Sequence, residues 1–125
     1  MKIIEAIEKA DSLYPNNYTG AEKIEWCNEL GAMLKREYAR SYVGKNSEAY
    51  EKIKNPTEED TLVPEPYDVM YIDFILAKCC YYQRDYDAYN QHITAFNSKL
   101  GDFARWYIER NMPQRDTDNK IVNWW

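Results

Sequence analysis

The sequence predicts an all-α protein, a bundle of four main helices with a long irregular loop between the second and the third. Apolar residues recur every three or four positions in four separate stretches, which is the period of a helix with one buried face. Proline and glycine residues separate these stretches. The 125 residues, 45% of them apolar, suffice for one domain with one hydrophobic core.

Two helices are expected before the loop. The first covers residues 2–14, and Pro15 ends it because proline lacks the amide hydrogen that a helix needs. The second starts at Thr19, which forms a capping box with Glu22, and runs to about residue 40. Gly31 in its interior costs about 1 kcal/mol relative to alanine. This glycine either permits a close helix crossing or is merely tolerated.

The loop, residues 41–65, contains glycine and proline residues that break any helical period. Residues 50–54 and 61–63 are short enough to pair as a small β-hairpin, and we keep this as an alternative to irregular structure. A connection of this length often carries a contact surface. Tyr50 is therefore a candidate partner-contact residue.

Two further helices follow, joined tightly at residues 83–85. Residues 67–84 are apolar over most of the helix circumference, so this helix is expected to be the central one. Residues 86–111 follow Asp85, a candidate helix cap, and would extend about 39 Å at 1.5 Å per residue. The apolar residues of this last helix form a heptad seam: Tyr86, Tyr89, Ile93, Phe96, Leu100, Phe103 and Tyr107.

Six tyrosines are expected to gather around the junction of the last two helices. Two compatible interpretations stay open. One is an aromatic plug in the core, with hydroxyls that reach solvent or backbone. The other is a protein-contact surface, where tyrosine is enriched, and on this basis Tyr67 is a candidate partner-contact residue. The six are Tyr67, Tyr71, Tyr81, Tyr82, Tyr86 and Tyr89.

We divide the chain into a helical domain, residues 1–113, and a flexible polar C-terminal tail, residues 114–125. The tail contains Trp124 and Trp125, two large side chains that gain nothing from exposure to water. They either fold back on the same domain or anchor in the pocket of a partner. Both tryptophans are therefore candidate partner-contact residues.

Composition and motifs argue against several classes of function. A net charge of −5 without a basic patch gives no electrostatic basis for binding nucleic acid. No stretch approaches the roughly 20 apolar residues of a membrane span, and we expect no membrane partner. His92 is the one histidine, and neither a glycine-rich phosphate loop nor a nucleophile elbow occurs. We therefore expect neither enzymatic activity nor a cofactor.

The three cysteines, Cys27, Cys79 and Cys80, are expected to be buried, reduced thiols. An odd number of cysteines argues against a disulfide framework. A zinc site built on the adjacent pair would need a fourth ligand that is not evident in the sequence.

Several short motifs follow one another in a particular order between residues 3 and 113. They are Asp11…Tyr14-Pro15-Asn16, Lys23-Ile24-Glu25-Trp26-Cys27-Asn28-Glu29-Leu30, Leu62-Val63-Pro64-Glu65-Pro66-Tyr67-Asp68, Tyr82-Gln83-Arg84-Asp85-Tyr86-Asp87-Ala88-Tyr89-Asn90 and Phe96-Asn97. In this combination the chain resembles the head–tail connector (adaptor) proteins of tailed phages and prophages of Gram-positive bacteria. Cys27 stands where that family has leucine, and Cys79-Cys80 stand where it has aliphatic residues, so the apolar character is kept.

The resemblance implies a structural virion protein without an active site. Such a protein forms a homo-oligomeric ring, dodecameric in the virion, with one subunit per subunit of the portal protein above it. The next connector or a tail-completion protein would be the further partner. The protein would lie at the head–tail interface of the virion, and in the bacterial host cytoplasm during assembly. The resemblance also implies a helical bundle with a small β-element in the long loop.

The alternative function is a helical, tetratricopeptide-like interaction module without enzymatic activity. The segment from Ala77 to Tyr89 resembles the turn between the two helices of such a unit. An array would show a second copy about 34 residues away, and no second copy is visible.

Overall fold

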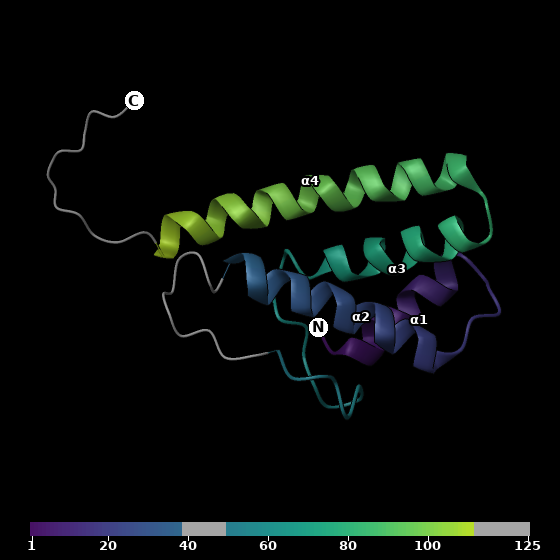
Figure 1. The fold of residues 1–125 in the computed structure, drawn as a ribbon, viewed down its shortest axis with the longest axis horizontal. Helices are drawn as coiled ribbons and strands as arrows, with labels where there is room; N and C mark the ends of the chain where they lie inside the picture. The colour runs from purple at the N-terminus through teal and green to yellow at the C-terminus, as the bar shows by residue number, and fades with distance from the viewer. Residues whose placement is uncertain (39–49, 112–125) are drawn as a thin grey trace, which may run out of the picture.

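The computed structural model describes residues 1–38 and 50–111, and these residues form four helices (Figure 1). No strand occurs in these two ranges. The all-α, four-helix prediction is therefore confirmed. The helices are α1 (Ile3–Leu13), α2 (Gly20–Leu34), α3 (Val69–Tyr82) and α4 (Tyr86–Asn111).

Helix α3 is the central helix, as its apolar circumference predicted. It packs against α1, α2 and α4, and Figure 1 shows α4 running antiparallel along α3, with α1 and α2 on the other side. Two aromatic residues of α4, Phe96 and Phe103, reach the core that α1, α2 and α3 build. The buried residues of α3 are Met70, Tyr71, Ile72, Ile75, Leu76, Ala77, Cys79 and Cys80.

The start of α2 has the predicted capping box. The Glu22 amide donates to Oγ1 of Thr19 (3.1 Å), and the Thr19 amide donates to Oε1 of Glu22 (2.8 Å). Both groups would otherwise lack a partner, because the first amides of a helix have no acceptor within it. After Leu34 the chain continues as a single π-helical turn over residues 35–38, so helical structure extends nearly to the predicted residue 40.

The described part of the loop between α2 and α3 binds to the start of α1. The Ile3 amide donates to the Glu59 carbonyl (3.0 Å), and the Ile4 amide donates to the Pro56 carbonyl (2.9 Å). These amides lie in the first turn of α1, where the helix itself offers no acceptor. The loop therefore acts as a cap for α1.

The small β-hairpin considered from the sequence does not form. Residues 50–54 and 61–63 lie within the described ranges, and neither segment is a strand. The backbone carbonyls of the loop instead accept hydrogen bonds from the start of α1, and an isolated β-bridge joins Lys2 to Asp60. Within the loop, the Glu59 carboxylate accepts two backbone amides and holds a compact turn.

Helix α3 begins two residues later than predicted. The Tyr67 amide donates to the Pro64 carbonyl (2.9 Å), and residues 64–67 form a turn. Helix α3 starts at Val69, and Asp68 precedes it without a side-chain cap hydrogen bond, because its carboxylate accepts from the N-terminal ammonium of Met1 (3.0 Å). Pro66 therefore lies in the turn before the helix.

Only part of the predicted heptad seam of α4 is buried. Phe96 and Phe103 are each 5% exposed, and Phe96 packs on Phe74 of α3 while Phe103 packs on Tyr67 just before α3, which confirms the register for these two members of the seam. Tyr86, the first member of the seam, is 54% exposed. The Tyr86 ring contacts the Tyr81 ring at the end of α3, with 6.3 Å between centroids, and it stays at the surface beside the turn. The proposed tail, residues 114–125, lies outside the described residues.

Candidate interaction surface

The turn between α3 and α4 fixes the position of the tyrosines at this end of the bundle. Arg84 has a φ of 65°, a left-handed conformation. The following Asp85 amide donates back to the Cys80 carbonyl (2.9 Å), which closes the end of α3. The Asp85 carboxylate accepts from the Ala88 amide (3.3 Å), as predicted for a helix cap. Helix α3 therefore ends and helix α4 begins with defined hydrogen bonds, only three residues apart.

An aromatic groove of about 500 Å³ lies beside this turn, and α2, α3 and α4 all contribute to it. Tyr81 and Tyr82 are each 51% exposed there. The Tyr81 ring contacts the Tyr89 ring at 5.5 Å between centroids. The groove is lined by Glu29, Phe74, Ala77, Lys78, Tyr81, Tyr82, Tyr89 and Ile93. Its size lies within the range of pockets that bind drug-sized ligands or the side chains of a partner.

Lys78 gives the aromatic groove a positive charge between its aromatic walls. Its Nζ lies 5.5 Å from the ring centroid of Phe74 and 5.8 Å from that of Tyr82. The same nitrogen lies 2.8 Å from Oε1 of Glu29 on α2. An ammonium group held over ring faces can also attract an aromatic side chain from a partner.

A row of stacked rings continues the aromatic surface from the groove across α2. Trp26 stacks on Tyr82, with 5.9 Å between centroids and 20° between planes. Tyr18 meets Trp26 edge to face at 5.5 Å. Ring pairs in these arrangements attract one another beyond their buried area. The row therefore holds the Tyr82 wall of the groove in place.

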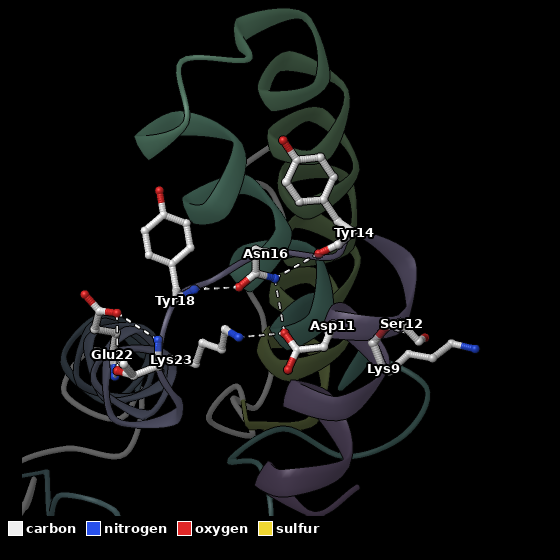
Figure 2. A network of polar contacts seen from close by, with 9 residues as sticks. Lys9, Asp11, Ser12, Tyr14, Asn16, Tyr18, Glu22 and Lys23 are labelled. Carbon is white, nitrogen blue, oxygen red and sulfur yellow. Dashed lines mark hydrogen bonds and ion pairs between the residues drawn. The ribbon is translucent and has the colours of Figure 1, made fainter.

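A polar network between α1 and α2 positions the Tyr18 end of this row (Figure 2). The buried Lys23 Nζ donates to Oδ1 of Asp11 (2.7 Å). Asn16 donates to the same carboxylate oxygen (3.2 Å) and to the Tyr14 carbonyl (2.8 Å), and its side-chain oxygen accepts the Tyr18 amide (3.1 Å). A buried ammonium group needs such a partner, because losing it would leave an uncompensated charge.

A second aromatic cluster lies at the other end of α3 and α4 and contains the candidate residue Tyr67. The half-buried Tyr67 ring lies 5.9 Å from Phe103 and 5.4 Å from Trp106. A shallow cavity of about 290 Å³ opens beside it, with Asp102 and Arg105 on its rim. Tyr67 is therefore placed where a partner can contact its edge.

The six tyrosines do not form one cluster as expected. Tyr81, Tyr82, Tyr86 and Tyr89 lie at the junction of α3 and α4. Tyr67 and Tyr71 lie near the opposite end of α3, because a helix of fourteen residues separates its two ends by about 21 Å at 1.5 Å per residue. Tyr71 is 1% exposed, and its hydroxyl accepts the Leu62 amide at 3.3 Å. The buried tyrosine of the core and the exposed tyrosines at the turn are thus different residues.

The candidate residue Tyr50 is engaged within the molecule. Its hydroxyl donates to Oδ1 of the buried Asn28 (2.9 Å), and the Ile53 amide donates to the same oxygen (2.9 Å). Burial raises the pKa of Tyr50 to about 12. Its ring lies on Gly31, where an added Cβ would meet ring carbon Cε1 at 2.5 Å. The sequence suggested a helix crossing at Gly31, but the close neighbour is this loop tyrosine.

The three cysteines are free and buried, as expected. Desolvation by burial raises the pKa of Cys27 to about 12 and that of Cys79 to about 11. The same effect raises the pKa of Cys80. Protonated, enclosed thiols react slowly, because the thiolate is the reactive form.

Only some of the residues that line the aromatic groove were predicted from the sequence. It identified the tyrosines near the α3–α4 turn, but it missed Lys78 and Glu29, which lie 2.8 Å apart across two helices. No local signal links two residues so distant in the chain. Trp124 and Trp125 lie outside the described residues.

Within residues 1–38 and 50–111, no helix is long and apolar enough to cross a membrane. The same residues contain no group of three or more histidine, cysteine or acidic side chains suited to a metal ion. The chain matches no family model, no curated protein and no solved structure.

Proposed function

We propose that the chain is a head–tail connector, a structural virion protein that forms a ring beneath the portal and joins the capsid to the tail. The observation that carries this proposal is the order and spacing of the motifs between residues 3 and 113. The resemblance covers all four helices and the loop, and it does not depend on one motif.

The contacts of the motif residues support the proposal. Asp11, Asn16 and Lys23 form the network that joins α1 to α2. Asp85 closes the turn between α3 and α4. The shared motifs therefore contain residues that shape the bundle, as expected if the resemblance reflects a common architecture. A ring subunit needs such a rigid bundle and surfaces for neighbours, and it needs no catalytic group.

The partners follow from this role. The ring, dodecameric in the virion, contacts the portal protein on one side and the next connector or a tail-completion protein on the other. The aromatic groove and the Tyr67 cluster, at opposite ends of the α3–α4 pair, are surfaces suited to such contacts, because aromatic side chains are enriched in protein interfaces. The protein acts at the head–tail interface, after assembly in the host cytoplasm.

Co-purification with the portal protein tests this function. The chain is co-expressed with the portal protein encoded in the same phage or prophage, and the portal is isolated by an affinity tag. We expect a stable complex with one copy of the chain per portal subunit. A portal protein from an unrelated phage serves as the control. The proposal fails if the chain does not bind its own portal, or if no portal gene accompanies its gene.

The tetratricopeptide-like module is the second candidate, favoured by the antiparallel pair α3 and α4 with its three-residue turn. The lengths of the two helices argue against it. Helix α4 has 26 residues and α3 has 14, whereas stacked repeats are built from units of similar size. Binding of a peptide on the inner face of several repeats is not expected from one such pair.

A further inference from the structure

Residues 50–60 of the loop are attached to the bundle mainly by hydrogen bonds. Each of them is exposed or half-buried. The buried core, as far as the structure describes it, consists of side chains from the four helices and of Val63. In Figure 1 the segment runs along the lower edge of the molecule, outside the helices. We call residues 50–60 the strap, because they connect two helices and add no buried side chain to the core.

The first part of the strap is attached to α2 through one side chain. Oδ1 of Asn28 accepts hydrogen bonds from the Tyr50 hydroxyl and from the Ile53 amide, each at 2.9 Å. The Ile53 side chain adds a half-buried contact with the core. Asn28 is 7% exposed, and a polar group in such a place needs its partners, because leaving it without them costs more than a hydrogen bond contributes. Asn28 is therefore the point where α2 holds the strap.

The second part of the strap is attached to the first turn of α1. The carbonyls of Pro56 and Glu59 accept amides of this turn. The Glu59 carboxylate also accepts the amides of Lys54 and Asn55, at 2.9 and 2.8 Å. These two residues directly follow Ile53, so Glu59 connects the part that contacts α1 to the part that contacts α2. We therefore expect the two attachments to be lost together.

A segment attached in this way costs less free energy to release than the helices cost to unfold. Regions with few buried apolar contacts open locally, and contiguous residues that share contacts open as one unit. When the strap leaves, the helices keep their own backbone hydrogen bonds and the buried side chains of the core. The bundle can therefore stay folded while the strap is released.

The strap covers the part of α2 that contains Cys27. Cys27 and Gly31 are four residues apart, so they face the same side of the helix. The Tyr50 ring lies on Gly31. Burial and, after it, the nearby Cys27 raise the pKa of Tyr50 to about 12. Cys27 is 1% exposed, and release of the Tyr50 ring removes part of its cover.

We propose that the strap opens as one unit while the four helices stay folded, and that this opening uncovers the Cys27 thiol. The closed strap then protects the thiol and the first turn of α1 at the same time. This conformational device uses contacts within one chain, so it holds whether or not the chain is a head–tail connector.

Native-state hydrogen exchange of the ¹⁵N-labelled full chain, followed by NMR, tests the opening. The amides of Ile3, Ile4 and Ile53 bond across the strap contacts, and the amide of Leu76 in α3 reports on the bundle. We expect the three strap-contact amides to share one protection factor within about threefold, at least about tenfold below that of Leu76. Their exchange should also depend less on urea, because strap opening exposes less surface than unfolding.

Two matched substitutions separate strap opening from unfolding of the bundle. Tyr50→Phe removes the hydroxyl that bonds to Asn28 and weakens only the closed state, so the strap-contact amides should exchange about fivefold faster. Thr19→Ala removes the cap of α2, which is present whether the strap is closed or open. Exchange at Leu76 should then be about fivefold faster, and exchange at the strap-contact amides should stay within about twofold of wild type.

Labelling of Cys27 with iodoacetamide, measured by mass spectrometry of the digested protein, gives the second readout. The labelling rate should rise about fivefold in Tyr50→Phe and stay within about twofold in Thr19→Ala, as strap opening does. Circular dichroism checks that both variants fold.

The exchange of the wild-type chain decides the first half of the proposal without any variant. Strap-contact amides that exchange no faster than Leu76 would show that the strap opens only when the bundle unfolds. Widely different protection of Ile53 and Ile3 would show that the strap is not one unit. A Cys27 labelling rate that is the same in wild type and Tyr50→Phe would overturn the second half.

Discussion

Gly31 is the residue whose role depends most on a distant part of the chain. The Tyr50 ring lies against it, and the Tyr50 hydroxyl is held by Asn28 on the same helix. Helix propensity alone would favour alanine at this position by about 1 kcal/mol. The close ring opposes it, because overpacking a well-filled site costs about 1–3 kcal/mol.

Gly31→Ala should therefore lower the free energy of unfolding by about 1 kcal/mol, the difference between these opposing effects. In a Tyr50→Ala background the steric conflict disappears, and the same substitution should raise it by about 1 kcal/mol. Chemical denaturation of the four proteins gives both values. An identical effect of Gly31→Ala in the two backgrounds would show that the ring does not restrict this position.

Cys27 makes stability depend on alkaline pH. Burial raises its pKa from 9.0 in the unfolded chain to about 12 in the folded protein. Its contribution is fully present below pH 9 and is lost progressively as the pH rises toward 12, because only the unfolded state then gains from ionisation. Between pH 9 and pH 10, this thiol should remove about 1 kcal/mol of stability.

Denaturation of wild type and Cys27→Ala at pH 8, 9 and 10 measures this contribution. The alanine variant is expected to be less stable overall, since it loses buried volume. Its stability should nevertheless fall less steeply between pH 9 and 10 than that of wild type. Parallel curves for the two proteins would mean that Cys27 ionises as readily in the folded protein as in the unfolded chain.

At the level of the elements, the turn between α3 and α4 holds an arginine in a conformation suited to glycine. A left-handed residue with a Cβ costs roughly 1–2 kcal/mol, and the Arg84 side chain is exposed, so little offsets this cost. Arg84→Gly should raise the free energy of unfolding by about 0.5–1 kcal/mol after the entropy of the unfolded glycine is subtracted. Arg84→Ala, which keeps the Cβ, is the control and should be nearly neutral in thermal denaturation.

The seam of α4 is tested by two aromatic truncations at its centre and its start. Phe96 is 5% exposed and packs on Phe74 at 5.3 Å, so Phe96→Ala should cost about 3–5 kcal/mol. Tyr86 is 54% exposed, so Tyr86→Ala should stay within about 0.5 kcal/mol. The midpoints of urea denaturation of the two variants and of wild type measure both effects. Equal shifts for the two variants would show that α4 is packed in another register.

Helix positions could be predicted from the sequence because their signals are local. The Thr19–Glu22 capping box, the Asp85 cap and the period of the apolar residues act within a few residues of each other. The late start of α3 could not be predicted, because proline is compatible with both a turn and a first helical turn.

The structure of the loop and the aromatic groove could not be predicted, because both depend on contacts between residues far apart in the sequence. The carbonyls of Pro56 and Glu59 accept hydrogen bonds from the start of α1, more than 50 residues earlier in the chain. No local sequence pattern predicts a contact over this separation. The ion pair of Glu29 and Lys78 in the aromatic groove forms because α2 packs on α3, and the sequence does not predict that packing. Tyrosine content pointed to a surface but did not say which tyrosines face outward.

At the scale of the whole molecule, the bundle has a packed side and an open side. Helices α1, α2 and α3 share the core, and α4 lies on α3 as an outer layer with few fully buried residues (Figure 1). Aromatic surface is concentrated at both ends of the α3–α4 pair. Exposed aromatic side chains at both ends of this pair are what the proposed contacts with neighbours would require.

Electron cryomicroscopy of the chain bound to the portal protein tests the central claim most directly. The proposed function predicts one closed ring of this four-helix bundle beneath the portal, with the subunit number of the portal. The particle without the chain is the control and should lack this layer. A portal surface that stays bare at saturating concentrations of the chain, or a chain bound without ring symmetry, would contradict the account.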